Sequence, residues 1–230
     1  MRFVYVRLRA PSGTLDALRD FYGTRLGLEI TGDAGSQVRV GETVLELFPA
    51  EGRPFYHLAL LAPGDRFDAA LDWADERVEL LPDPETGEVV FESEAWHSQA
   101  CYFHDAAGNI VELIAHSGIG DRGGEGGFAA TELLGLSELG VVGERRAAAA
   151  ELASVGIDVW DGTVDEHNQL AFAGEPGRTL ILAPQSRPWV PTGRPAEPHP
   201  VDAVVAGTQS GVVTLPDSGS TIRSEQEGVS

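Results

Sequence analysis

GNIVELIAH, residues 108–116, decides the fold, because a related run occurs earlier in the chain. The stretch enters from a glycine turn and is apolar up to its terminal histidine, except for the carboxylate of Glu112. An unpaired carboxylate is costly to bury, so a strand of this composition must bring Glu112 a compensating partner. The earlier run, TVLELF at residues 43–48, carries Glu46 at the matching place.

Each of these runs closes a similar series of elements. Residues 2–9 alternate as a strand does, and a helical pattern and short strand candidates follow them. From residue 55 the same order recurs, with VYVRL at residues 4–8 answered by YHLAL at residues 56–60. We therefore expect an α+β protein in which two βαβββ modules, residues 1–50 and 55–117, form one paired domain of residues 1–117.

The rest of the chain is expected to hold three further segments. Residues 118–127 are rich in glycine and predict a flexible linker. Residues 128–186 form a looser third copy, a βαβββ-like module. Residues 187–230 begin with a proline-rich extended stretch, and we expect a hairpin and a flexible tail after it.

Composition narrows the classes of function. The 230 residues carry a formal net charge of −20, which disfavours binding to nucleic acid or to an anionic membrane. No apolar run is long enough to span a bilayer, and the single cysteine cannot form an internal disulfide. These features predict a cytoplasmic protein whose partner is a small molecule.

Aligning the two full copies places Tyr5 on His57 and Glu46 on Glu112. If the modules pack about a pseudo-two-fold axis, their first and last strands bring these four side chains together. Two carboxylates and an imidazole suit a divalent metal of intermediate hardness, such as Zn, Ni, Mn or Fe. A bound cation would then be the partner of Glu112.

The stretches VRLRA, GETVLELF, YHLAL and YFHDAAGNIVELI resemble the vicinal-oxygen-chelate superfamily over residues 1 to about 117. This superfamily contains glyoxalase I, fosfomycin- and bleomycin-resistance proteins and extradiol dioxygenases. The resemblance implies paired modules that form a curved mixed sheet around a cavity. It is closest to glyoxalase I, whose ligand pattern of His or Gln, Glu, His and Glu is matched by Glu46, His57 and Glu112, whereas Tyr5 departs from it.

The resemblance implies a metal-dependent glyoxalase-like lyase or isomerase that acts on a small oxygenated substrate through metal-bound enediolate chemistry. Glu112 would be the base, Tyr5 a ligand or proton donor, and a thiol adduct of a 2-oxoaldehyde the substrate. One alternative is an extradiol-type Fe(II) dioxygenase, which Tyr5 argues against. The other is a metal-free protein that binds small molecules or sequesters a drug, in which Arg7 neutralises the carboxylates.

Further residues are expected around the cavity. Arg7 and Arg9 share the face of Tyr5 and favour an anionic substrate, while Trp96 and Phe103 are candidates for its walls. In the third copy, Glu138 aligns with Tyr5 and His57, but the last strand of that copy has no carboxylate. We therefore expect the third module to bind no metal and to cover the cavity or to form the interface of a homodimer.

Overall fold

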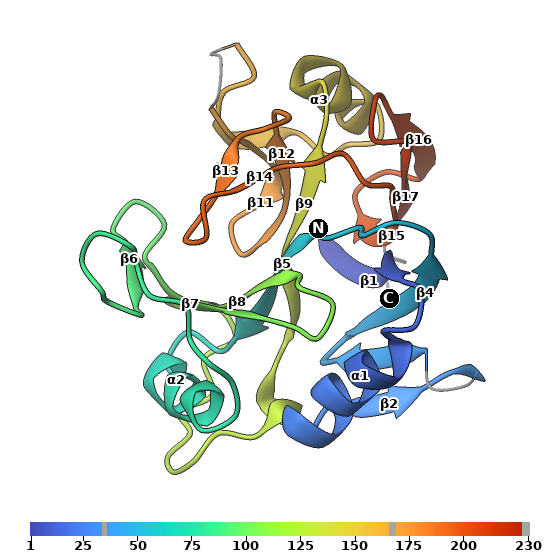
Figure 1. Ribbon diagram of the computed structural model, residues 1–230. Helices are drawn as coiled ribbons and strands as arrows, with labels where there is room; N and C mark the ends of the chain where they lie inside the picture. Colours follow the sequence, from blue (N-terminus) through green and yellow to red (C-terminus); the bar gives the residue numbers. More distant parts are fainter. Residues whose placement is uncertain (34–35, 166–168, 227–230) are drawn as a thin grey trace.

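The computed structural model describes residues 1–33, 36–165 and 169–226 (Figure 1). Its elements, in chain order, are β1 (Arg2–Pro11), α1 (Leu15–Arg19), η1 (Asp20–Arg25), β2 (Glu29–Thr31), β3 (Gln37–Val40), β4 (Thr43–Ala50), β5 (His57–Ala62), α2 (Phe67–Asp75), β6 (Phe91–Ser93), β7 (Ser98–His104), β8 (Ile110–His116), η3 (Ala130–Glu132), β9 (Gly135–Val142), α3 (Arg145–Ala153), β10 (Val159–Gly162), β11 (Ala171–Glu175), β12 (Arg178–Ala183), β13 (Pro188–Trp189), β14 (Arg194–Pro195), β15 (Val201–Gly207), β16 (Gly211–Leu215) and β17 (Ser220–Gln226). Of these helices, none is long and apolar enough to cross a membrane.

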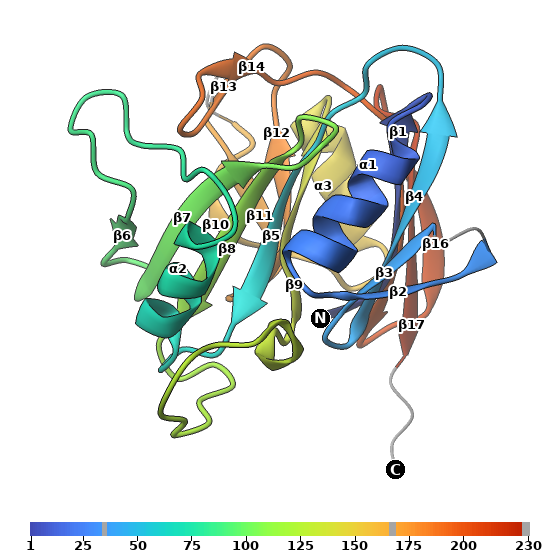
Figure 2. The same cartoon turned by 60° about the horizontal axis from the view of Figure 1, so that its bottom comes forward.

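Two large mixed sheets, which lie side by side, organise these strands (Figure 2). Sheet A has seven strands in the order β16-β17-β15-β1-β4-β3-β2, and sheet B has eight in the order β10-β11-β12-β9-β5-β8-β7-β6. Each sheet is built from two modules whose first strands pair antiparallel at its centre, β1 with β15 and β5 with β9. The expected α+β class and the curved mixed sheets are confirmed.

The strand order corrects the expected pairing of the modules. Residues 1–50 do not pair with residues 55–117: β1 pairs with β15 from the C-terminal segment, and β5 pairs with β9 from the third module. The inner two modules thus build sheet B, and the outer two build sheet A. The physical reason is that β1 and β5 are both central strands with a neighbour on each side, so each needs the first strand of another module, and local sequence patterns do not specify which module supplies it.

The C-terminal segment is more structured than its composition indicates. Strands β15, β16 and β17 form a fourth module without a helix, in which β17 runs parallel to β15 and antiparallel to β16. The expected flexible tail is corrected up to residue 226, because residues 220–226 form β17; residues 227–230 lie outside the described residues. Before this module, β13 and β14 form a small separate hairpin.

Sheet B has one face in the core and one face toward a cavity. Leu58 and Leu60 of β5 join the main hydrophobic core, whereas His57, Ala59 and Leu61 alternate onto the other face. Helices pack on the core side: α2 buries Phe67, Ala70, Trp73 and Ala74, which recur at helical spacing along one stripe. The cavity face is left for the polar residues of the site.

Two contacts outside the ladders join the parts of the molecule. The hydroxyl of Thr43 in β4 donates to the carbonyl of Phe3 (2.8 Å) and accepts the N–H of Leu136 in β9 (3.1 Å), which couples sheet A to sheet B. In the glycine-rich linker, the carbonyls of Gly124, Gly126 and Gly127 accept hydrogen bonds from the guanidinium of the buried Arg66. The linker is therefore held against the module of residues 55–117.

Candidate metal centre

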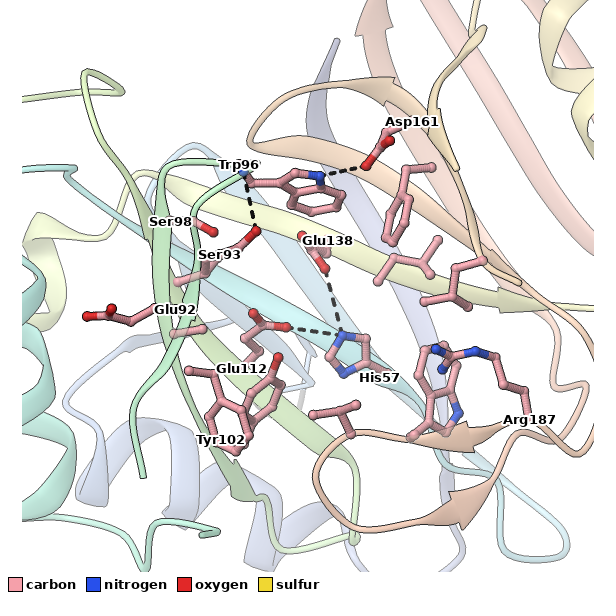
Figure 3. A pocket seen from close by; sticks show the side chains of 18 residues that line it. His57, Glu92, Ser93, Trp96, Ser98, Tyr102, Glu112, Glu138, Asp161 and Arg187 are labelled. Carbon is pink, nitrogen blue, oxygen red and sulfur yellow. Dashed lines mark hydrogen bonds and ion pairs between the residues drawn. The ribbon is translucent and has the colours of Figure 1, made fainter. Parts of the chain in front are cut away.

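Three adjacent strands of sheet B bring together His57, Glu112 and Glu138. His57 begins β5, Glu112 lies in the neighbouring β8, and Glu138 lies in β9 on the other side. The Nε2 of His57 is 3.3 Å from the Oε2 of Glu112 and 3.9 Å from the Oε2 of Glu138 (Figure 3). One possible ligand atom of each residue lies within 4.8 Å of those of the other two, and all three side chains are about 95% buried.

The buried carboxylates of this cluster favour the binding of a cation. Burial by itself lowers the pKa of His57, but hydrogen bonds to Glu112 and Glu138 and their negative charges outweigh it and raise that pKa from 6.5 to about 9. Burial, reinforced by the charge of Glu112, raises the pKa of Glu138. A single imidazolium between two carboxylates leaves a buried negative charge when all three groups are ionised, and a divalent cation would remove it.

The neighbouring groups fix the cluster from two sides. Tyr102 of β7 lies opposite Glu112 of β8, and burial together with the charges of Glu112 and Glu138 raises the pKa of Tyr102 well above its usual value. The indole of Trp189, from the β13–β14 hairpin, stacks on His57 with 5.0 Å between ring centroids. Gly140 makes room for this indole, because a Cβ at that position would lie 3.0 Å from the ring.

The donor set fits a divalent cation in type and number. One imidazole nitrogen and two carboxylates are ligands used by Zn, Mn and Fe, and three protein ligands leave positions open for a substrate. The Nδ1 of His57 is buried and has no hydrogen-bond partner among the described residues, so the Nε2 that faces the carboxylates is the nitrogen that would bind the ion.

A cavity of about 410 Å³ opens on the cluster. Its volume is in the range of small-molecule sites, and apolar and aromatic side chains supply most of its walls. The lining residues are His57, Phe91, Glu92, Ser93, Trp96, Ser98, Ala100, Tyr102, Glu112, Ile114, Glu138, Asp161, Leu170, Phe172, Ile181, Arg187, Trp189 and Val190.

The structure separates the residues predicted as metal ligands. It brings His57 and Glu112 together, but it places Tyr5 and Glu46 in sheet A. There the hydroxyl of Tyr5 donates to the Oε2 of Glu46, and Arg7 pairs with the same carboxylate at 3.9 Å. Burial and the contact with Glu46 raise the pKa of Tyr5 to about 12, so this phenol stays protonated.

The strand register explains why the two sets look equivalent in the sequence. Tyr5 pairs with Val44, two residues before Glu46, just as His57 pairs with Ile110, two residues before Glu112. The aligned positions are therefore equivalent, but each set lies in its own sheet.

The same register makes Arg7 in sheet A equivalent to Ala59 in sheet B, and Asp202 equivalent to Glu138. In sheet A, Arg7 pairs with Asp202 as Ala59 pairs with Glu138 in sheet B. The guanidinium of Arg7 in sheet A therefore stands at the position where sheet B has only the methyl group of Ala59. The ion pair of Arg7 with Glu46 fits the alternative in which arginine replaces a metal, but only in sheet A.

The other predicted residues divide between the cavity and the rest of the molecule. Trp96 lines the cavity, as expected for a wall. Phe103 is fully buried in the main core against Phe21, and its side of β7 faces away from the site. Arg9 is exposed in β1, where its N–H donates to the hydroxyl of Tyr56 (3.2 Å). The arginine of the cavity is Arg187, which the sequence analysis did not single out.

Glu138 is the functional residue that the sequence analysis placed but set aside. The third module was expected to bind no metal because its last strand lacks a carboxylate, and that strand does carry Ile181 at the fourth position. A signal was nonetheless present, since Glu138 interrupts the apolar run GLSELGVV just as Glu112 interrupts its own. Because β5 is shared by both neighbours, Glu138 reaches the site from the first strand of its module.

Comparisons with known proteins support the fold. No protein-family model and no curated protein sequence matches this chain. Among solved structures, a candidate dioxygenase from Bacillus subtilis aligns over 99% of this chain and 86% of its own, with a TM-score of 0.58 and 14% identity. Glyoxalase I from Zea mays aligns over 98% of this chain and 92% of its own, with a TM-score of 0.52 and 13% identity. The chain therefore shares the fold of these two proteins, which is the fold that the resemblance of its sequence stretches implies.

Proposed function

We propose that the protein is a metal-dependent enzyme that binds a small substrate through two adjacent oxygens and shifts a proton between neighbouring carbons, as a glyoxalase-like isomerase or lyase. The observation that carries this proposal is the buried group of His57, Glu112 and Glu138 at the end of a cavity. The similarity of the fold to glyoxalase I from Zea mays supports it.

The roles of the three residues follow from their contacts. His57, Glu112 and Glu138 would hold the ion, which supplies Lewis acidity next to the substrate's oxygens. Glu112 lies closer to the imidazole of His57 than Glu138 does. Both carboxylates would be ligands, and because the pKa of Glu138 is raised, we assign the proton transfer to Glu138 in addition, while Glu112 would act as a ligand only.

A metal count with matched variants tests the site. Protein purified without chelator, or reloaded with Zn, Ni, Mn or Fe(II), should bind one ion per chain. Glu138→Gln should weaken the affinity for the ion by roughly 100-fold, because it removes a charged ligand. The control Glu46→Gln, which makes the same exchange in sheet A at the position equivalent to Glu112, should leave the affinity unchanged. An unloaded wild-type protein, or equal effects of both variants, would favour the metal-free binding function.

A second function, extradiol-type cleavage by Fe(II), is favoured by two observations. Ile181 leaves the fourth position without a ligand, so three protein ligands remain, and one structural neighbour is named a candidate dioxygenase. The carboxylate of Glu138 stands where a dioxygenase of this fold would have a second histidine, which is why we place this function second. Assays of hemithioacetal isomerisation and catechol cleavage on the Fe(II)-loaded protein separate the two.

A further inference from the structure

Half-buried aromatic rings form opposite walls of the cavity. Phe91 and Tyr102 pack edge to face with 4.9 Å between centroids, and Trp96 and Phe172 do so with 4.5 Å. Figure 3 shows Trp96 and Tyr102 on either side of Glu112. Each of these four residues remains partly accessible, and the aliphatic side chains Ala100, Ile114, Leu170, Ile181 and Val190 line the same cavity. Such walls suit a flat apolar ligand, because ring faces and edges contact another ring favourably.

The charges around the cavity disfavour a strongly anionic ligand. Its lining includes the carboxylates of Glu92 and Asp161 besides the two of the metal centre, against one arginine, Arg187. Arg7 and Arg9, which were expected to attract an anion, lie in sheet A. The chain as a whole carries a net charge of −20. A peptide thiol adduct with two free carboxylates would be repelled by this field.

We propose that the substrate is a small aromatic compound of low charge, whose ring lies between the two aromatic pairs and whose two neighbouring oxygens point to His57, Glu112 and Glu138. The placement of the oxygens rests on the proposed metal-dependent function, while the placement of the ring rests on the cavity walls alone. This substrate class replaces the thiol adduct that the family resemblance implies.

Two hydroxamates that differ only in the ring test the proposal. Benzohydroxamate and acetohydroxamate present the same pair of oxygens to a metal, and calorimetric titration of the metal-loaded protein gives both affinities. The phenyl group should make benzohydroxamate bind about 50-fold more tightly, from the additional apolar area that it buries. S-methylglutathione, an anionic peptide thioether, should not compete with it.

Two matched variants locate the ring. Phe172→Leu keeps an apolar side chain in the cavity wall and should reduce the preference for benzohydroxamate about 5-fold, with acetohydroxamate affinity and metal content unchanged. Phe48→Leu makes the same exchange at an exposed ring of sheet A and should change neither. Circular dichroism and urea midpoints verify that both variants are folded. If Phe172→Leu does not fold, Trp96→Leu replaces it as the cavity variant.

The outcomes separate the two proposals. Equal affinities for the two hydroxamates, an unchanged preference in a folded cavity variant, or competition by S-methylglutathione would overturn the aromatic substrate while leaving the metal centre intact. If the protein takes up no metal, the proposed function fails, and benzamide against acetamide then measures the ring preference in the metal-free protein. A clear preference for benzamide would support the aromatic site, and equal binding would overturn it.

Discussion

The raised pKa of His57 makes the stability of the metal-free protein depend on pH. Its folded pKa of about 9 lies above the unfolded value of 6.5, so the folded state binds a proton more tightly. The corresponding stabilisation is complete below pH 6.5 and is lost as the pH rises through 9. A difference of roughly 2.5 pKa units corresponds to a loss on the order of 3 kcal/mol in the free energy of unfolding. Solvent screens this interaction little, because only 5% of His57 is exposed.

Among the described residues, the other histidine and cysteine groups with shifted pKa values act outside this pH window. Burial lowers the pKa values of His116 and His199, so their effects fall below pH 6.5. Burial raises the pKa of Cys101 to about 12, so its effect begins above pH 9. Glu138, whose pKa is also raised, acts in the same direction as His57. The fall in stability between pH 6.5 and 9 is therefore a property of the proposed metal site.

Urea unfolding followed by tryptophan fluorescence measures this dependence. In the presence of EDTA, the free energy of unfolding should fall between pH 6.5 and 9, and an NMR titration of His57 should give a pKa near the upper end of that range. A saturating divalent metal should abolish the fall, because the ion replaces the proton on Nε2. A stability that is constant within about 1 kcal/mol over this range without metal would refute the reasoning, since the expected change is several times RT.

Three substitutions test other parts of the structure. Tyr22→Phe removes the 2.8 Å hydrogen bond to the buried carboxylate of Asp105 and should cost about 1–3 kcal/mol in urea unfolding; a change within error would contradict a bond of structural weight. Thr43→Val leaves the N–H of Leu136 in β9 without its acceptor and should cost a similar amount, whereas a neutral result would show that the sheets are coupled elsewhere. Gly140→Ala would place a methyl group 3.0 Å from the covering indole, so it should weaken benzohydroxamate binding while stability changes little; unchanged binding would mean that the hairpin yields.

The sequence carried the local structure and part of the site. Alternating and helical patterns defined the βαβββ repeats, and the carboxylate inside an apolar strand identified Glu112 correctly as a buried group in need of a partner. The register between Tyr5 and His57, and between Glu46 and Glu112, also agrees with the strand pairing. These features depend on neighbours in the chain or in one module, and local patterns encode them directly.

Local sequence patterns do not predict which other module each module pairs with. Strand β5 can pair edge to edge with any module that offers a similar first strand, and β1 and β9 both do. The choice of β9 depends on which faces are buried in the finished fold. Applying to Glu138 the argument already made for Glu112 would have identified the third member of the buried cluster, because both interrupt apolar strands.

The nesting of the modules has a consequence for biosynthesis. Sheet B draws on one continuous stretch of chain, so its two modules can associate as soon as α3 and the strands after it have left the ribosome. The first module precedes sheet B in the chain, but its strand β1 pairs with β15 and must wait until β15 has been synthesised. The edge of β1 that β15 covers therefore stays unpaired during this interval, and the sheet that holds His57, Glu112 and Glu138 can form before the sheet that contains β1.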